Sequence, residues 1–480
     1  MKKSILKRGK GILLVVFTVG VIMGCSQKKE TADIGESAEI KEQENEISVD
    51  IPKREYELYI AVPIEYMSMR ETPGYGEDIV TNIYPETLLK AIGEPTEASG
   101  KQFYHVATLD GRFEGYCAAD YCIKISYEYN DAELNIVNTE NAKYTYQEME
   151  TDLHELENTY GEYLSVDIVG KSVEKRNIYR VVLGNPSAPN KIFIQAGIHG
   201  REYMSCQQVM KLIEYYAANY NKGYYEDTPY SDLFEKKSLH IIPMSNPDGV
   251  SISQLGEEAI VSSERIEMMR AAYERDKNTL IYTEDPSGYK YWYDTYANPT
   301  YDRYANGYDE IISYEEYLSL WKANANGVDI NRNFGAGWEN IQQKEEPGCE
   351  FFKGNYADSE PETVILENLI KENNYNYILN YHSRGQIIYY DVAGNSVQMS
   401  SESEKLAQTV SELDRYQLVN CQDSASVVLG GLGDWAMLTQ NIPSITIEMG
   451  KGPCPLGSEE FSSIWHRGRE VWAKVMCDIE

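Results

Sequence analysis

The sequence predicts an α/β protein with a small all-β unit in front of its main domain. From Tyr144 onward, segments with helical spacing alternate with short apolar runs of strand length, which indicates a sheet with parallel portions. Before that, from Tyr56, strand-length runs alternate with Gly, Pro, Asn and Asp, which predicts a small antiparallel barrel. A chain of 480 residues, 42% of them hydrophobic, is also too long for one small core.

The charge balance excludes one class of partner. The formal net charge is −32, so a nucleic-acid backbone would be repelled and no nucleic-acid partner is expected. Tyrosine is unusually frequent, with 40 Tyr against 9 Phe. A tyrosine can be half-buried with its hydroxyl in water, which suits carbohydrate or peptide surfaces, although composition alone does not locate such a surface.

Residues 1–24 read as a signal peptide. Five basic residues precede an apolar run, 12–23, that is too short to span a bilayer comfortably. The run ends in Gly24 and Cys25, and this arrangement resembles a bacterial lipobox, in which the cysteine becomes the lipidated first residue. The alternative is an uncleaved anchor with an incidental cysteine. Either reading places the rest of the protein outside the cytoplasmic membrane, and the first predicts an extracytoplasmic protein anchored to the membrane by lipid at Cys25.

A tether and a β unit follow. Residues 25–54 are polar and charged without aromatics, which is typical of a disordered tether. In the predicted barrel, 55–128, the segments SMRETP (68–73) and GYCAADY (115–121) resemble the bacterial SH3-type domain. That resemblance implies a module that binds cell-wall peptides; a barrel that only packs on its neighbour is the alternative.

The main domain is predicted to occupy residues 132–480. The first helix places Met149, Leu153 and Leu156 on one face, and a hairpin follows. The order after it is strand, helix, strand and then a long irregular insert, and the elements expected are a helix at 146–160, a hairpin at 165–185, a strand at 191–197, a helix at 205–220 and a strand at 239–246.

The insert, roughly 251–317, is rich in Tyr, Asp, Glu and Asn. It is too long for an idle loop in a compact domain, so we expect it to cover or shape one side of a substrate cleft. The seven cysteines beyond Cys25 are interpreted as structural, with bridges permitted by export but none assignable.

Three side chains at strand ends form a candidate metal site. His199 and Glu202 follow the strand at 191–197, and His382 follows a β run at 377–381. Working residues gather where strands of α/β sheets end, so these three should meet at one edge. A catalytic zinc takes three such ligands and a water. The sequence therefore predicts one zinc ion.

Two further groups suggest the reaction. Glu448 ends the apolar strand SITIEMG and is a candidate base that takes a proton from water and passes it to a leaving nitrogen. Asn331 and Arg332 offer an amide beside a planar guanidinium, a pair suited to holding a carboxylate. Together these groups describe removal of a residue from the C-terminus of a peptide substrate.

At this point the sequence resembles the zinc carboxypeptidase family. The motifs that carry the resemblance occur in the family's order, and they are HGRE (199–202), NPDG (246–249), DINRNF (329–334), SEPE (359–362), YHS (381–383), GDW (433–435) and TIE (446–448). The resemblance implies a mixed, mainly eight-stranded sheet with helices on both faces and one catalytic zinc. It also implies that His199, Glu202 and His382 bind the metal, that Glu448 is the base, and that Arg201, Asn331 and Arg332 line the substrate subsites.

The sequence departs from the family at two positions, and a third position bears on specificity. The arginine that stabilises the oxyanion follows a tryptophan, but here Trp321 is followed by Lys322, so a lysine takes that role or another residue does. Ser426 stands at the position where animal members of the family have a tyrosine that closes over the substrate. Gly433 stands at the specificity position, so no charge there selects the substrate side chain.

Several segments also look like the bacterial branch that includes γ-D-glutamyl-diaminopimelate peptidases. The predicted function is therefore a zinc metallocarboxypeptidase that acts on peptidoglycan stem peptides. A γ-D-glutamyl-diamino acid endopeptidase is the first alternative, and a catalytically degenerate wall-binding lipoprotein is the second. Arg384, which follows His382 and Ser383, is interpreted as a local ion-pair partner, with a position near the cleft as its alternative.

Overall fold

The computed structural model describes residues 57–125, 134–284, 290–295, 310–341, 343–423 and 429–479. These residues belong to one compact unit, Lys53–Glu480. The predicted signal, Cys25 and the tether lie outside the described residues. Among the described residues, none of the helices has the length and apolar character needed to cross a membrane. The boundary between the two predicted domains stays a prediction.

The N-terminal β region is an antiparallel sheet of eight strands. Its strands run in the order β3-β2-β7-β6-β4-β1-β8, with β5 paired to β6. Alternate residues of these strands form a small core, in which Met69, Leu89, Val106 and Cys117 are fully enclosed. The strand bounds are β1 Leu58–Ala61, β2 Met67–Arg70, β3 Ile79–Ile83, β4 Leu88–Ala91, β5 Thr96–Ala98, β6 Lys101–Thr108, β7 Glu114–Ala118 and β8 Cys122–Ile125.

The main domain is built on a second eight-stranded sheet, which confirms the predicted α/β class. The strand order is β19-β18-β20-β17-β11-β14-β10-β9. The centre is parallel, because β11 pairs in parallel with both β14 and β17, and β17 pairs in parallel with β20. The strands are β9 Leu164–Lys171, β10 Asn177–Gly184, β11 Asn190–Ala196, β14 Lys237–Ile242, β17 Tyr377–Ser383, β18 Ile387–Tyr390, β19 Gln417–Asn420 and β20 Ser444–Met449.

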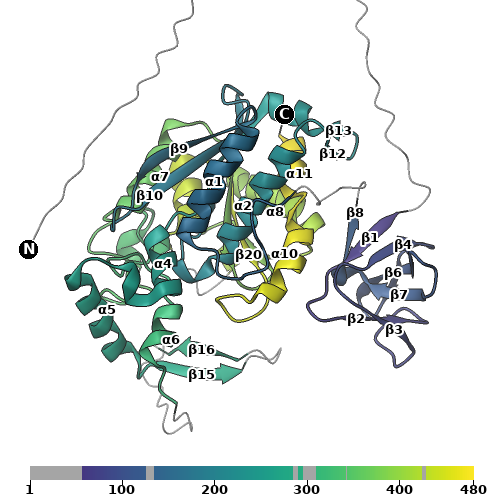
Figure 1. Ribbon diagram of the computed structural model, residues 1–480, viewed down its shortest axis with the longest axis horizontal. Coiled ribbons are helices and arrows are strands. Elements are labelled where there is room, and N and C mark those ends of the chain that lie inside the picture. Colours follow the sequence, from purple (N-terminus) through teal and green to yellow (C-terminus); the bar gives the residue numbers. More distant parts are fainter. Residues whose placement is uncertain are drawn as a thin grey trace, which may run out of the picture. The chain divides into compact units, whose positions relative to one another are not determined.

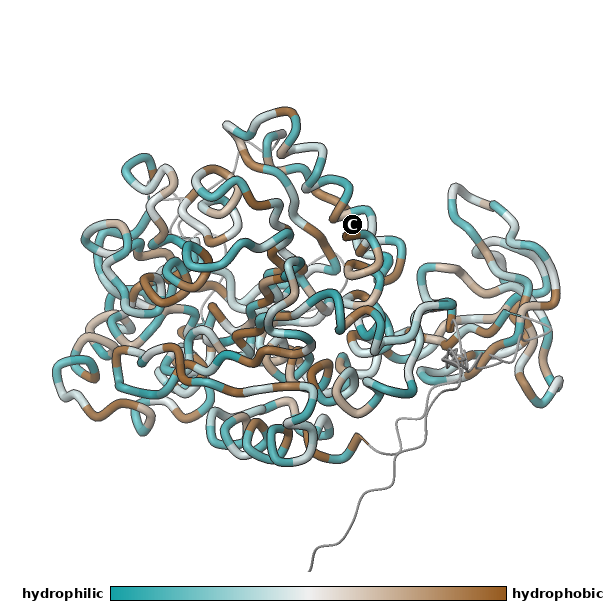
Figure 2. Tube along the Cα trace, turned by 90° about the horizontal axis from the view of Figure 1, so that it is seen from above, coloured by the Kyte–Doolittle hydropathy of each residue, from teal (hydrophilic) through white to brown (hydrophobic). Residues whose placement is uncertain are grey.

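Helices cover both faces of this sheet (Figure 1). Successive side chains of a strand point to opposite faces, so β11 buries Ile192 and Ile194 in one apolar cluster and Phe193 in another. The first cluster includes residues of α1, α2, α8, α10 and α11, and the second includes residues of α7 and α9. In Figure 2 hydrophobic segments are frequent in the interior of the trace, and hydrophilic segments are frequent in its outer loops.

The helices predicted from periodicity are confirmed. In α1 the residues Met149, Leu153 and Leu156 are buried, and Thr145 and Glu148 close its N-terminus as a capping box. The helix bounds are α1 Tyr146–Tyr160, α2 Met204–Ala218, α3 Tyr230–Lys236, α4 Pro247–Leu255, α5 Ser263–Asp276, α6 Tyr314–Ser319, α7 Pro361–Glu372, α8 Val397–Asp414, α9 Leu432–Trp435, α10 Phe461–Gly468 and α11 Val471–Asp478.

The insert is more regular than its composition suggests. Its first residues continue α4, α5 follows, and a hairpin is formed by β15 (Leu280–Glu284) and β16 (Lys290–Asp294) before α6. The expectation of an irregular segment was wrong for these parts. Charged residues dominate α5, but its Met269 and Ala272 pack on Trp321 and its neighbours, so tertiary packing selects the helix. Residues 285–289 and 296–309 lie outside the described residues.

The seven cysteines of the described chain are unpaired thiols. Cys117 and Cys122 are buried in the core of the β region, and burial raises the pKa of the Cys117 thiol to about 12. A protonated, enclosed thiol behaves as a small apolar group. This agrees with a structural role and does not use the bridges that export would permit.

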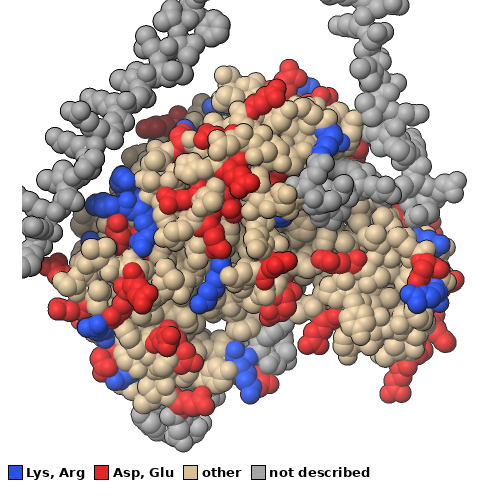
Figure 3. Space-filling view, in the orientation of Figure 1, with Lys and Arg blue, Asp and Glu red and all other residues tan. Residues whose placement is uncertain are grey.

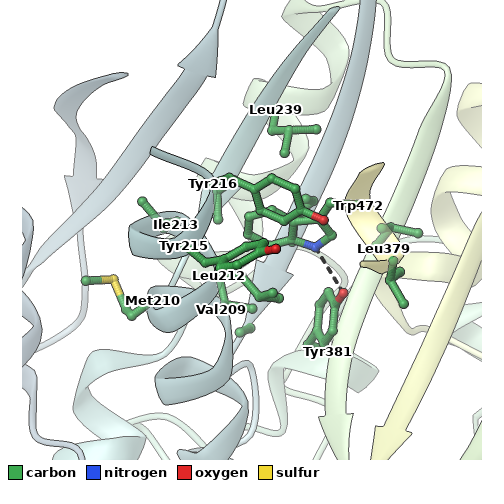
Figure 4. Close-up of a cluster of buried hydrophobic side chains, with 14 of the residues drawn as sticks. Val209, Met210, Leu212, Ile213, Tyr215, Tyr216, Leu239, Leu379, Tyr381 and Trp472 are labelled. Atoms are coloured by element: carbon green, nitrogen blue, oxygen red, sulfur yellow. Dashed lines mark hydrogen bonds between the residues drawn. The ribbon is translucent and has the colours of Figure 1, made fainter. Parts of the chain in front are cut away.

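The C-terminal helix α11 closes the core of the main domain. Its Trp472 is fully buried and lies parallel to the ring of Tyr216 in α2, with ring centroids 5.5 Å apart. The indole nitrogen donates a hydrogen bond of 3.0 Å to the hydroxyl of Tyr381 in β17 (Figure 4). Trp472 therefore connects α11 with α2 and with β17, the strand that contains His382.

We expect Trp472→Ala to lower the free energy of unfolding by about 3–5 kcal/mol, because it leaves a large cavity and an unpaired Tyr381 hydroxyl. Urea denaturation of the full chain measures the change. Tyr356→Ala is the control, since this side chain is 64% exposed and its loss should change the free energy by less than about 0.5 kcal/mol. Equal denaturation midpoints for the two variants would contradict the assignment.

Candidate metal centre and active site

His199 and Glu202 lie in a tight turn between β11 and α2. The strand ends at Ala196, and Gly197 takes a φ of +64°, which glycine adopts without strain. Gly200 leaves no room for a side chain, because a Cβ there would collide with the backbone of Gly249. The turn therefore needs both glycines to bring His199 and Glu202 to the same point.

The NPDG motif holds this turn in place. The amide nitrogen of Asn246 donates to the carbonyl oxygens of Ile198, Lys322 and Ala323 at 3.1, 3.3 and 3.1 Å. One buried side chain thus connects the turn to the segment after Trp321. Asp248 of the same motif is fully buried and pairs with Arg176 at 2.7 Å. These contacts give the motif a positioning role that spacing alone did not reveal.

His382 arrives from the neighbouring parallel strand. Its Nδ1 lies 3.2 Å from Nδ1 of His199 and 3.0 Å from a carboxylate oxygen of Glu202. The other oxygen of Glu202 lies 2.8 Å from His199 Nδ1. All three side chains are buried, and they offer ligand atoms within 4.8 Å of one another. Two imidazoles and a carboxylate are a donor set that fits zinc, so the three predicted residues are brought together.

The charge on this cluster matches a cation. Burial by itself would raise the pKa of the Glu202 carboxyl, but the adjacent imidazoles of His199 and His382 hold it well below its usual value. The backbone N–H of Ser383 also donates to Glu202 at 3.2 Å. The glutamate is therefore a fixed anion between two ring nitrogens, an arrangement that a divalent ion would stabilise.

Asp329 is a residue of the site that the sequence reasoning did not assign. It is fully buried, and its Oδ1 lies 3.4 Å from Nε2 of His199, the ring nitrogen that faces away from Glu202. Burial would raise the pKa of the Asp329 carboxyl, but the contact with His199 holds it well below its usual value. A carboxylate in this place orients the ring and fixes its proton on Nε2, which leaves Nδ1 for a metal. Its position in the DINRNF motif was the available signal.

Glu448 lies beside the cluster on β20. It is the register partner of His382 across the parallel pair β17–β20, so the two side chains point to the same side of the sheet. Glu448 is half-buried. Burial raises the pKa of its carboxyl to about 7, while the charges of His382 and Lys322 oppose the rise. A carboxyl with a pKa near neutrality is suited to proton transfer.

Lys322 lies close to these groups. It is 8% exposed, and its Nζ lies 5.5 Å from the ring centroid of Phe351. Its carbonyl oxygen accepts a hydrogen bond of 3.0 Å from Gly200 N–H. The backbone of Lys322 therefore supports the turn that carries His199 and Glu202, which we call the metal turn. A buried ammonium group near Glu448 is compatible with the predicted electrophile, and that role stays a prediction.

Arg201 directly precedes the ligand Glu202 and makes two contacts of its own. Its guanidinium pairs with Glu350 at 3.2 Å and donates to the carbonyl of Leu320 at 3.4 Å. Glu350 is a second residue that spacing did not single out. The pair fixes Arg201 on one wall of the site, next to the insert.

Asn331 and Arg332 lie on another wall. The side-chain oxygen of Asn331 accepts a 3.1 Å hydrogen bond from the backbone of Leu432 in α9. The Arg332 guanidinium donates to the backbone carbonyl of Asn331 at 2.7 Å, and the role of the two residues as a carboxylate-binding pair stays a prediction. Gly433, also in α9, would place a Cβ 3.2 Å from the hydroxyl of Ser444, so little space remains for a side chain. Ser426 lies outside the described residues.

We expect Asp329→Asn to weaken zinc binding about 10- to 100-fold, because an amide orients His199 without the carboxylate's charge. Competition with a chromogenic chelator measures the affinity directly, without any substrate. The matched control is Glu345→Gln, which changes an exposed acid and should leave the affinity as it is. An unaltered affinity in the Asp329 variant would exclude the orienting role.

Comparisons with known proteins agree with this geometry. The family pattern described as zinc carboxypeptidase matches residues 149–471. A curated relative, γ-D-glutamyl-L-diamino acid endopeptidase 1 of Lysinibacillus sphaericus, is 26% identical over 332 residues, which cover 68% of this chain and 71% of the relative. Mast cell carboxypeptidase A of Homo sapiens is 22% identical over 252 residues, 52% of this chain and 46% of the relative.

Solved structures share the fold. Bovine thrombin-activatable fibrinolysis inhibitor, in complex with tick carboxypeptidase inhibitor, aligns with a TM-score of 0.50 at 16% identity and covers 71% of this chain and 97% of that chain. The family pattern spans more than half of the sequence and contains the His-Glu-His cluster. The protein therefore belongs to the zinc carboxypeptidase family and is a zinc metallopeptidase.

Proposed function

We propose that this zinc peptidase hydrolyses peptide bonds near the C-terminus of cell-wall stem peptides. The observation that carries the proposal is the convergence of His199, Glu202 and His382, with Glu448 beside His382 on the next strand. In this proposal the first three residues hold one zinc ion and Glu448 is the catalytic base. The position of a glutamate next to a metal ligand is what hydrolysis by an activated water requires.

The side chains divide the work of the reaction. A zinc ion bound here would polarise the attacking water and the scissile carbonyl. Glu448 accepts the proton of that water and then donates it to the leaving nitrogen, so one carboxyl serves as base and acid in turn. Lys322 supports the negative charge that develops on the carbonyl oxygen, as a point charge in place of a guanidinium. Asn331 and Arg332 bind the substrate's terminal carboxylate and set which bond reaches the centre.

The charge around the centre favours an anionic substrate. The chain is strongly acidic, and acidic side chains are widespread on the face shown in Figure 3. Cations nevertheless lie near the centre, because the charges of Lys322 and Arg201 act on the Glu448 carboxyl and that of Arg332 acts on the Asp329 carboxyl. Local positive charge in an acidic protein attracts substrates with several carboxylates, which cell-wall stem peptides carry.

A cell-wall setting has three supports. The relative from Lysinibacillus sphaericus is named for hydrolysis at a γ-D-glutamyl-L-diamino acid bond. The N-terminal β region contains the two segments that resemble wall-binding SH3-type domains. The N-terminus reads as a lipoprotein signal, which would hold the enzyme at the outer side of the membrane.

A second candidate keeps the centre and changes the bond. A γ-D-glutamyl-diamino acid endopeptidase would cut the γ-linked bond inside the stem peptide, and the name of the relative favours it. Arg332 favours the first candidate, because it provides a carboxylate site close to the centre. The alternative of a degenerate wall-binding protein is disfavoured by the complete cluster and by Glu448 in register with His382.

We expect Glu448→Gln to lower kcat by about 100- to 10,000-fold with zinc still bound, because the amide cannot accept the water's proton. Activity of the zinc-loaded full chain on model peptides gives kcat, and metal analysis gives the zinc content. Glu404→Gln, on the exposed side of α8, is the control. Full turnover in Glu448→Gln or in the metal-free protein would reject the mechanism.

Mass spectrometry of digested wall fragments separates the two candidate bonds. Loss of the C-terminal residue alone supports the carboxypeptidase, whereas cleavage between γ-glutamate and the diamino acid supports the endopeptidase. Zinc uptake with no cleavage of any fragment would support the degenerate reading.

Membrane anchoring has a separate test at the N-terminus. We expect Cys25→Ser to prevent lipidation and to move the protein from the membrane fraction to the soluble fraction, since the cysteine sulfur carries the lipid in this interpretation. Fractionation of cells that express the full chain, with incorporation of labelled fatty acid, measures both effects. Membrane retention of the variant would instead support an uncleaved anchor.

A further inference from the structure

The hairpin of the insert has two distinct faces. Its strands pair without a shift, with Ile281 opposite Tyr293 and Tyr282 opposite Trp292. Because side chains alternate along a strand, Tyr291 and Tyr293 lie on one face, while Trp292 lies on the other. The face with Trp292 packs on the apolar cluster around Trp321. The face with the two tyrosines points elsewhere.

Buried charges fix the base of the hairpin to the main domain. Lys344 is almost fully buried and pairs with Asp294 of β16 at 2.6 Å and with Asp276 of α5 at 3.2 Å. Thr295 adds a backbone hydrogen bond of 2.9 Å to the carbonyl of Thr279. A buried cation shared between two carboxylates holds both elements in one arrangement, so the hairpin is a defined wall.

The tyrosine face meets the strand end that carries His382. The guanidinium of Arg384, two residues after this histidine, lies over the ring of Tyr291 at 4.9 Å. Arg384 also donates to the carbonyl of Lys451 at 3.1 Å. A cation over the face of an aromatic ring is attracted to it, so this contact restricts the positions that the Arg384 guanidinium can take, and a planar guanidinium is suited to binding a carboxylate. The hairpin therefore contacts, through Tyr291, a cation that lies two residues after the metal-site residue His382.

The other face of the hairpin meets the segment that carries His199 and Glu202. Trp292 and Asp294 line a small hollow together with Arg201 and Glu350, and Arg201 directly precedes Glu202. Asn331 and Arg332, the pair predicted to bind the substrate's terminal carboxylate, belong to a different wall, because Asn331 is hydrogen-bonded to α9. If Asn331 holds the C-terminal end of a peptide, the hairpin side is left for the residues that precede the scissile bond.

We propose that Arg384, oriented by Tyr291 of the hairpin, binds a carboxylate on the acyl side of the cleaved bond. The insert thereby makes the enzyme selective for an acidic residue at that position. A γ-linked glutamyl residue presents its α-carboxylate there, and an ordinary glutamate presents its side-chain carboxylate. This inference rests on the proposed peptidase function and names the substrate group that the hairpin side of the site recognises.

The test compares two matched pairs of peptides with the zinc-loaded full chain. One pair has a γ-linked glutamyl residue before the cleaved bond, with its α-carboxylate either free or amidated. The other pair has an ordinary glutamate or glutamine at that position. The quantity measured is the ratio of kcat/KM for the acid over the amide. The variants are Arg384→Gln and Tyr291→Ala, with Tyr293→Ala as the control on the same face of the strand.

For whichever pair is cleaved, the unaltered chain should prefer the acid by roughly 10- to 100-fold. Arg384→Gln should bring the ratio close to one, and Tyr291→Ala should lower it about threefold, chiefly through KM. Tyr293→Ala, at a side chain that is 50% exposed, should keep the original ratio. An original ratio near one, a ratio that survives Arg384→Gln, or equal losses on both peptides of a pair would overturn the proposal.

Binding decides the matter if neither pair is cleaved. Calorimetry with the Glu448→Gln chain measures the affinity of the acid and amide peptides without turnover. In that background Arg384→Gln should weaken binding of the acid peptide about tenfold more than that of the amide. Peptides that bind with this pattern but are not hydrolysed would reject the proposed function and keep the subsite; equal affinities would reject the subsite.

Discussion

The parallel pairing of β11 with β17 is the constraint on which the site depends. Ala196 is the register partner of Tyr381, so both strands end at the same edge and their next residues emerge side by side. His382 follows at once, and the turn after β11 needs only three residues to reach His199. Loss of this register by one residue would turn His382 to the opposite face and separate the ligands. The apolar clusters on both faces hold that register.

Around this edge, buried polar side chains fix the positions of the metal ligands more closely than the strands alone do. The Asn246 side chain is hydrogen-bonded to the metal turn and to the backbone of Lys322. Asp329 orients His199 through the ring nitrogen Nε2. Each acts through a partner that is itself enclosed, where an unpaired polar group is costly. The metal turn is thus determined by several weak constraints that agree, and a pre-arranged donor set loses less conformational entropy on binding an ion.

The sequence was sufficient for the strands, the main helices and the metal cluster. Alternating apolar runs identify β11 and β17, and a histidine directly after a strand needs no tertiary knowledge to be placed at its end. The hairpin of the insert could not be predicted in the same way, because its anchor is Lys344, fifty residues after Asp294. Asp329 was visible inside a recognised motif, but its role follows only from a 3.4 Å contact with a residue far away in the chain.

The position of Trp472 has a consequence for how the molecule is assembled. This side chain fills the space between α2 and β17, yet it is contributed by a helix that begins at Val471. A ribosome that has released only the metal-binding strands has made every zinc donor but not the indole that fills the interior beneath them. The hydrophobic surface of α2 that contacts Trp472 then stays exposed, and open to aggregation or to chaperone binding, until α11 has been synthesised.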